Sequence, residues 1–134
     1  MDKLISNLPA DLRRYLYNVY LSIEKERKDI KSVQENPYDI KNIVIPSRAV
    51  QLTAVKRYGC SIEYIHKPSE VVQLAAVKQD GFAVQYIINP SEAVQLAAVK
   101  QDGYAICNIQ NPSEAVQLAA VKKNWFVINS IVKR

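Results

Sequence analysis

The sequence is poor in several residue types that common functional sites need. It has three glycines, one histidine and two cysteines among 134 residues. A zinc site with four Cys and His ligands needs at least one more such residue than the chain has, and a phosphate-binding loop needs more glycines. No run approaches the ~20 consecutive apolar residues of a membrane-spanning helix, and the first residues lack the apolar stretch of a secretory signal. We therefore expect no metal, cofactor or membrane, and a cytoplasmic location.

The composition is that of one folded domain. Apolar residues make up 49% and charged residues 23% of the chain, a balance typical of globular proteins. The net charge is +5 and is not clustered. Residues 1–47 contain eight Lys and Arg against seven Asp and Glu, and residues 48–134 contain ten against six. This modest basic excess favours solubility and weak attraction to anions, and does not identify nucleic acid as the partner.

A 22-residue repeat dominates the sequence. The segment 46–56 recurs at 68–78, 90–100 and 112–122, and sixteen of the twenty-two residues of 68–89 recur in 90–111. All three glycines occupy one repeat position. A degenerate and more charged copy precedes these units, and apolar residues at helical spacing precede that copy. We therefore divide the single repeat domain 1–134 into a capping helix (1–23), a degenerate repeat (24–45) and four regular repeats (46–67, 68–89, 90–111 and 112–134).

Each unit reads as two helices. Asn89 is the expected N-cap, Pro90 the first helical residue, and Glu92 a capping-box partner. This helix of about 12 residues then breaks at Gly103, which can adopt a positive φ. Asp102 is placed to cap a second, shorter helix that ends before the next proline. The sequence predicts an all-α short solenoid. The alternative is a β-solenoid or leucine-rich-type coil, because the repeat periods of such coils include this one and residues 82–87 alternate.

The unit resembles a known repeat type. The segment Asn89-Pro90-Ser91-Glu92-Ala93-Val94-Gln95-Leu96-Ala97-Ala98-Val99-Lys100-Gln101-Asp102-Gly103 is similar to short α-helical repeats of unknown function that we associate with giant viruses, bacteriophages and bacteria. The resemblance covers residues 46–134 well and 24–45 weakly. In the last unit Trp125 replaces the glycine and Asn124 the aspartate. The resemblance implies a phage or viral origin, and a factor that binds and inhibits a protein in the host cytoplasm.

Comparison of the units with one another indicates a candidate binding stripe. The varied positions lie mainly on the second helix, in two columns three residues apart, and residues at that spacing share a helix face. Stacked units would present them as one surface, as repeat proteins do for their partners. The alternative is neutral drift on a solvated face. The stripe comprises Glu63, Gln85, Cys107 and Asn129 in one column and His66, Ile88, Gln110 and Val132 in the other.

A row of lysines carries the second hypothesis, nucleic-acid binding. Packed helices lie ~8–10 Å apart, so the row would contact phosphates only sparsely. An acidic row, Glu70, Glu92 and Glu114, and the nearby Asp80 and Asp102 favour charge pairing between repeats instead. The lysines are Lys56, Lys78, Lys100 and Lys122.

The last unit suggests a docking end. It is strongly apolar, whereas solenoids usually end in a polar cap. We expect this end to bind a partner or a second copy of the chain through Trp125, Phe126, Ile128 and Ile131. The alternative is that its Lys, Asn and Ser residues already form a polar cap.

Catalysis has little support in this sequence. Cys60 and His66 could act as nucleophile and base, but nothing supplies an orienting group or an oxyanion site. Cys60 and Cys107 lie two units apart, too far for a disulfide. Aligned rings such as Phe82 and Tyr104 are expected to fill gaps between helix pairs. The sequence thus predicts a non-catalytic protein–protein interaction module, with a nucleic-acid binder or a self-assembling structural protein as alternatives.

Overall fold

The computed structural model describes residues 5–132, which contain helices and no strand. A long helix, α2 (Ala10–Glu35), comes first, and α7 (Ile128–Val132) comes last. Between them, four ten-residue α-helices alternate with short 3₁₀ helices. The α-helices are α3 (Arg48–Arg57), α4 (Glu70–Gln79), α5 (Glu92–Gln101) and α6 (Glu114–Lys123). The 3₁₀ helices are η1 (Pro37–Asn42), η2 (Gly59–Tyr64), η3 (Gly81–Tyr86), η4 (Gly103–Asn108) and η5 (Trp125–Val127).

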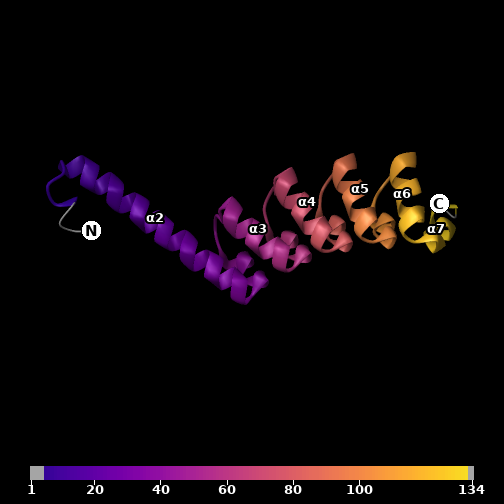
Figure 1. Cartoon of the computed structure of the whole chain (residues 1–134), viewed down its shortest axis with the longest axis horizontal. Coiled ribbons are helices and arrows are strands. Elements are labelled where there is room, and N and C mark those ends of the chain that lie inside the picture. Colours follow the sequence, from indigo (N-terminus) through magenta and orange to yellow (C-terminus); the bar gives the residue numbers. More distant parts are fainter. Residues whose placement is uncertain (1–4, 133–134) are drawn as a thin grey trace.

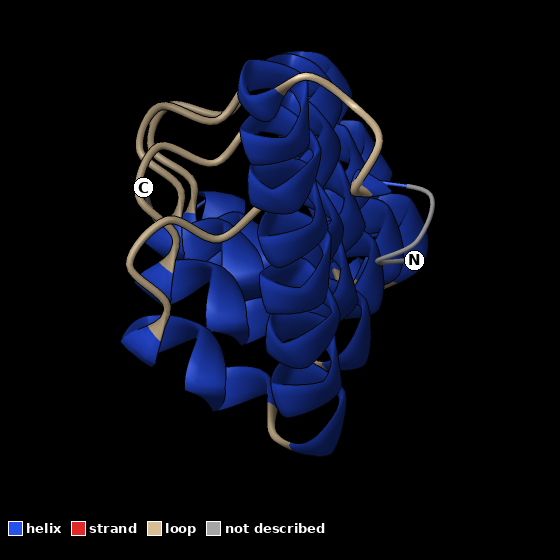
Figure 2. Cartoon of the chain, turned by 90° about the vertical axis from the view of Figure 1, so that its left-hand side faces the viewer, coloured by secondary structure: helices blue, strands red, loops and turns tan. Residues whose placement is uncertain are grey.

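The helices form an elongated two-layer array. Helices α3 to α6 stand side by side along the long axis (Figure 1), and seen from the end they form one layer beside a second layer of short helices (Figure 2). Each α-helix packs on the next α-helix and on the short helices of its own unit and the preceding one. The predicted all-α repeat fold is confirmed, and the β-solenoid alternative is wrong for the described residues.

The first helix of each unit begins two residues later than the sequence predicts. In the unit 90–111 the N-cap is Ser91, whose Oγ accepts a hydrogen bond from the Val94 N–H at 3.3 Å. The Pro90 carbonyl lies outside the helix and accepts from the Gln95 side chain at 2.9 Å. Asn89 has a φ of 50° and therefore belongs to the preceding bend. The helix has ten residues rather than the ~12 expected from the pattern.

The second helix of each unit is a 3₁₀ helix of six residues in η1 to η4. Its predicted cap is confirmed, because the Asp102 side chain accepts from the Tyr104 N–H at 3.0 Å. The helix ends at Asn108, and Ile109 is already extended. The geometry of a 3₁₀ helix has three residues per turn, so side chains three apart stand directly above one another.

The repeated glycine serves close packing and not a positive φ, so that prediction is wrong. No glycine has a positive φ; among the described residues Lys67, Asn89 and Asn111 have one instead. A Cβ added to Gly81 would lie 2.6 Å from the Ala98 carbonyl oxygen of the next α-helix, closer than real Cβ contacts come. The equivalent distance for Gly103 is 2.5 Å. The glycine therefore sets how closely successive units approach.

A side-chain amide completes this contact. Gln79 Oε1 accepts from the Gly59 N–H at 2.6 Å, and Gln101 Oε1 accepts from the Gly81 N–H at 3.0 Å. In the last interface Lys123 stands at the glutamine position, and the neighbouring Asn124 supplies the acceptor for Gly103 at 2.8 Å. Each of these glycine N–H groups is thus satisfied by the following unit.

The N-terminal part of the chain is more continuous than the sequence suggests. Helix α2 runs without a break across the expected boundary between residues 23 and 24. Its C-terminal turns pack against α3 and η1 and contribute Val33, the one buried residue of the helix, to the core. Those turns and η1 together occupy the place of a repeat.

The core is aliphatic. Its buried residues are Val, Ile and Ala, at positions that recur from one unit to the next. No aromatic side chain of the described residues is among them. The expectation that the rings fill gaps between helix pairs is therefore wrong. The small spacing that the glycines impose leaves room for Val and Ala, and places the rings outside.

We predict that substitution lowers the free energy of unfolding at one of two backbone positions and leaves it unchanged at the other. Gly81→Ala should lower the free energy of unfolding by about 1–3 kcal/mol, because the new methyl group overlaps the Ala98 carbonyl. Asn89→Gly is the matched control and should cause no loss, because glycine tolerates the φ of 50° there. Urea unfolding measures both. A stabilised Gly81→Ala variant would refute the packing role of the glycine.

Candidate binding surface

All eleven aromatic side chains of this protein are exposed. Three of them lie on α2, and the other eight belong to the layer of short helices or to its N-cap residues. The closest rings include Tyr38 and Tyr58, whose centroids are 5.1 Å apart, and Trp125 and Phe126, which stack at 3.8 Å. A hydrogen bond with Tyr38 raises the pKa of Tyr58 to about 12. We define the aromatic face as Tyr38, Tyr58, Tyr64, Phe82, Tyr86, Tyr104, Trp125 and Phe126.

The first predicted column adjoins this face. Phe82 and Gln85 are three residues apart on η3, and Tyr104 and Cys107 are three apart on η4, so each pair lies on one edge of its 3₁₀ helix. Gln85 Nε2 also donates to the Phe82 carbonyl at 3.0 Å. Glu63, Gln85, Cys107 and Asn129 are all exposed. The varied residues therefore stand next to exposed rings.

In three of the four regular units, the second predicted column does not share a helix with the first. His66, Ile88 and Gln110 follow the ends of their 3₁₀ helices, and only Val132 is helical, in α7. All four are exposed. The expected sharing of one helix face is wrong for these three units, because the short helix ends before this column, and it holds in the last unit, where Asn129 and Val132 both lie on α7. Cys107 and Gln110 nevertheless line one hollow of about 510 Å³.

The acidic row binds serines of the next unit and not lysines. Ser91 Oγ donates to Glu70 at 3.3 Å, and Ser113 Oγ donates to Glu92 at 2.5 Å. Glu26 accepts from Ser47 in the same way. The predicted charge pairing between repeats is wrong within residues 5–132, where the two ion pairs found both lie inside α2.

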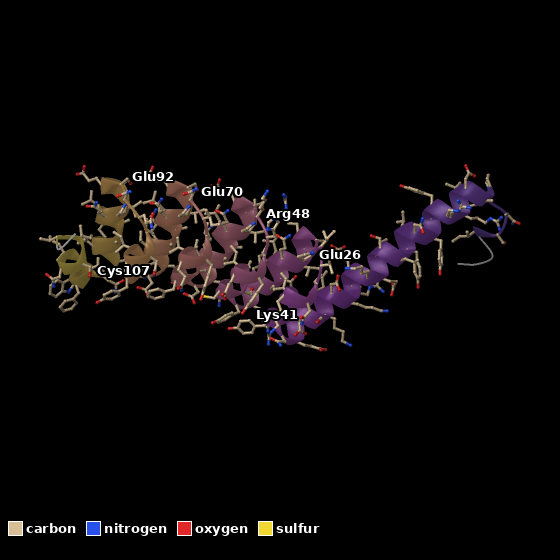
Figure 3. All side chains as sticks on the ribbon, turned by 180° about the vertical axis from the view of Figure 1, so that it is seen from behind. Glu26, Lys41, Arg48, Glu70, Glu92 and Cys107 are labelled. Carbon is tan, nitrogen blue, oxygen red and sulfur yellow. The ribbon has the colours of Figure 1, made fainter. Side chains whose placement is uncertain are left out.

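One position in this row lacks the carboxylate. Figure 3 shows Glu26, Arg48, Glu70 and Glu92 in sequence along one edge of the array. Arg48 stands where Ser69 would need an acceptor, and the Ser69 Oγ is buried with no hydrogen-bond partner. This interface therefore lacks a hydrogen bond that its neighbours form.

The lysine row lines shallow grooves in the layer of α-helices. Each groove lies between successive helices, measures roughly 520–580 Å³, and has leucine and alanine on its floor with a lysine from each helix at its rim. Lys56, Lys78, Lys100 and Lys122 are exposed. The predicted row thus lies along the layer of α-helices, which stands beside the layer of short helices (Figure 2).

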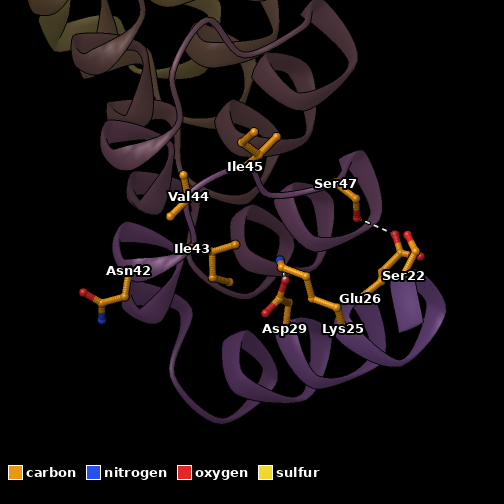
Figure 4. Close-up of a pocket in the computed structure, with 9 residues that line it drawn as sticks. All are labelled: Ser22, Lys25, Glu26, Asp29, Asn42, Ile43, Val44, Ile45 and Ser47. Carbon is orange, nitrogen blue, oxygen red and sulfur yellow. Dashed lines mark hydrogen bonds and ion pairs between the residues drawn. The ribbon is translucent and has the colours of Figure 1, made fainter. Parts of the chain in front are cut away.

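Another pocket, of about 520 Å³, lies between α2 and the loop 42–47 (Figure 4). Its charged groups are paired within the chain: Lys25 binds Asp29 at 2.6 Å, and Glu26 accepts from Ser47. Val44 and Ile45 form its exposed apolar wall. The Glu26–Ser47 pair joins α2 to the loop 42–47, and neither pair indicates a catalytic or ligand-binding role for the charged groups.

Cys60 is poorly suited to be a nucleophile. Its Sγ donates to Asp80 Oδ2 at 3.4 Å. Burial, together with the charge and hydrogen bond of Asp80, raises the pKa of the Cys60 thiol to about 11. His66 is exposed beyond the end of η2. Within residues 5–132, no group of three or more His, Cys, Asp and Glu side chains could hold a metal ion.

The expected docking end is partly incorporated in the core. Ile131 packs against the core cluster. Trp125, Phe126 and Ile128 are exposed at 65%, 55% and 44%. Trp125 occupies the glycine position, and only the five-residue helix α7 follows η5 within residues 5–132, so no ten-residue α-helix of a next unit approaches Trp125 as α6 approaches Gly103.

Sequence reasoning missed the N-terminal members of this surface. Tyr38 and Lys41 are the residues of the degenerate copy that correspond to Phe82 and Gln85, and both are exposed. Figure 3 places Lys41 and Cys107 along the same side of the array. Extending the column of Glu63 back by one repeat period would have found Lys41, and extending the column of Phe82 back by two periods would have found Tyr38.

Comparisons with known proteins assign no family, because no protein-family model, curated protein or solved structure matches the chain. Within residues 5–132, no helix is both long enough and apolar enough to cross a membrane.

We predict that Arg48→Glu stabilises the protein. The new carboxylate would accept from Ser69 and add about 1 kcal/mol to the free energy of unfolding. The gain should disappear when Ser69→Ala is present as well, because the hydroxyl donor is then missing. A double-mutant cycle by urea unfolding measures this coupling. An equal gain in both backgrounds would mean that helix-dipole effects, and not the hydrogen bond, are responsible.

We predict slow alkylation of Cys60. A pKa of about 11 instead of 9.0 reduces its thiolate fraction at pH 8 by about two orders of magnitude. Cys107→Ser, which leaves Cys60, should react far more slowly than Cys60→Ser, which leaves Cys107. The neutral thiol's contribution to stability is present below about pH 9 and is lost as pH rises toward 11. Equal reaction rates of the two variants would contradict the raised pKa.

Proposed function

We propose that this protein is a non-catalytic protein-binding module that presents the aromatic face and the adjoining varied column to a protein partner. The observation that carries the proposal is the exposure of every aromatic side chain. Interfaces between proteins are enriched in Tyr, Trp and Phe, and such side chains dominate binding energy when a partner buries them.

The arrangement of the surface supports the same function. The rings recur on a rigid array whose spacing is set by the glycine contacts, so little entropy is lost when a partner binds. Between the rings stand side chains that differ from unit to unit: Lys41, Glu63, Gln85 and Cys107. A regular scaffold with a varied row selects one partner surface over others.

The resemblance to repeats of phages and giant viruses extends this proposal to the partner. On this basis the partner is a protein of the host, and the module inhibits that protein by covering part of its surface. A face with rings and one charge of each sign suits a partner surface with apolar pockets and few charges.

We predict that positive charge placed in the varied column, next to the aromatic face, strongly reduces capture of the partner. The experiment is an affinity capture from a host-cell lysate that has been treated with nuclease. In it, Gln85→Arg combined with Cys107→Arg should reduce the amount of partner protein recovered at least tenfold. The matched control, Ala93→Arg with Ala115→Arg, adds the same charge to exposed positions in the α-helical layer and should leave recovery unchanged.

Two results would overturn this assignment. Greater loss with the control variant would place binding in the lysine-rimmed grooves. Recovery that disappears with nuclease and falls steeply with salt would identify nucleic acid as the ligand, since binding to phosphates releases counterions.

A further inference from the structure

The N-terminal half of α2 projects beyond the repeat array (Figure 1). The helix packs against α3 and η1 through its C-terminal turns, where Val33 is buried and Ile30 packs on the core. From Ala10 to Ile23, only Leu16 is less than exposed. Half of a 26-residue helix is therefore without cover from the array.

This projecting half has an apolar stripe. Leu12, Leu16, Val19 and Ile23 are spaced by four, three and four residues, which places them within an arc of about 60° on the helix. Ile30 continues the same arc toward the C-terminus of α2, and Val33 lies about 40° beyond its edge. One stripe thus runs along α2, with its C-terminal part covered by the protein's own array and its N-terminal part bare.

A bare stripe on an isolated helix is unstable in water. Helical segments of fewer than ~12–15 residues are marginal without tertiary packing. Leu12, Val19 and Ile23 are 41%, 38% and 51% exposed, and the flanking Tyr15 and Tyr20 are 64% and 41% exposed. Cover by another helix would supply the packing that this segment lacks.

The pattern of the stripe matches a second copy of itself. The spacing of four, three and four reads the same in both directions. In an antiparallel pair, Leu12 would face Ile23 of the second copy, and Leu16 would face Val19. This is the alternation of apolar layers that coiled coils use, and it is closed by a two-fold axis between residues 17 and 18.

The array itself determines the direction of pairing. It covers the stripe from about residue 26 onward on the same side that a partner helix would occupy. A parallel second copy would bring its array to the same place, where the two arrays would collide. An antiparallel copy places each array beyond the N-terminal end of the other helix.

The area is sufficient for a weak but specific dimer. The exposed parts of the stripe and its two flanking tyrosines amount to roughly 500 Å² per copy, so the pair would bury on the order of 1,000 Å². That lies at the lower limit of specific interfaces. We propose that two copies of this chain form an antiparallel dimer through residues 12–23 of α2.

The dimer does not depend on the proposed partner-binding function. The dimer would nevertheless affect partner binding, because it would hold two aromatic faces at opposite ends of one particle. Binding to a partner with two sites would gain from the raised effective concentration.

Analytical ultracentrifugation of the full chain tests the dimer. At about 100 µM, a high concentration chosen because interfaces at the lower limit of size are weak, we expect a species of twice the 15.2 kDa chain mass. Val19→Glu should give the monomer. Leu21→Glu is the matched control: Leu21 is 46% exposed on the opposite side of α2, so the same charge there should leave the dimer intact. Thermal unfolding followed by circular dichroism should be alike for the two variants.

A cross-linking experiment tests the direction. In a chain with Cys60→Ser and Cys107→Ser, the double substitution Leu12→Cys with Ile23→Cys should form covalent dimers on mild oxidation, and Leu12→Cys alone should not. Efficient dimers from Leu12→Cys alone would indicate parallel pairing and overturn the antiparallel arrangement.

Three results would overturn the dimer altogether. These are a wild-type chain that stays monomeric at about 100 µM, equal masses for Val19→Glu and Leu21→Glu, and dimers lost only when Trp125 is changed to Ser. Co-sedimentation of a monomeric chain with phosphatidylcholine–phosphatidylglycerol vesicles, lost in Val19→Glu, would assign the stripe to a lipid surface instead.

Discussion

The close approach of each glycine to a carbonyl of the next α-helix is the contact on which the rest of the structure depends. Because a methyl group does not fit between Gly81 and the Ala98 carbonyl oxygen, only glycine allows this spacing. The adjacent amide of Gln101 then satisfies the glycine N–H. Distance and hydrogen bonding are thus set at the same point in successive units, and the array is regular because this point recurs with the repeat.

The sequence departs from its repeat where this contact is absent. In η1 a proline, Pro37, takes the glycine position; proline has no N–H to satisfy, and residue 57, where an amide would stand, is Arg57. At the other end Trp125 takes the same position, and the described chain has no further repeat unit beyond it, only the five-residue helix α7. Pro37 thus removes the need for an amide acceptor, and Trp125 lies in the last described unit, where no next unit packs against it.

The same spacing explains where the aromatic side chains lie. A core of Val, Ile and Ala fills the narrow interval between units, so rings remain on the layer of short helices. Their exposure is a consequence of the scaffold and also the basis of the proposed binding surface. The projecting half of α2 is a second exposed apolar region, and it differs from the first because it lies outside the array.

The period, the helical class, the aspartate caps and the exposure of the varied columns were all predictable from the sequence, because they depend on residues close together in the chain. The packing role of Gly103 was not predictable in this way, because it is set by the carbonyl oxygen of Ala120, seventeen positions further along the chain. The exposure of Phe82 and Tyr104 and the serine partners of Glu70 and Glu92 were likewise decided by contacts between units. Local pattern specifies which helices form, whereas the distance between them, and hence what is buried, is determined only when the units pack.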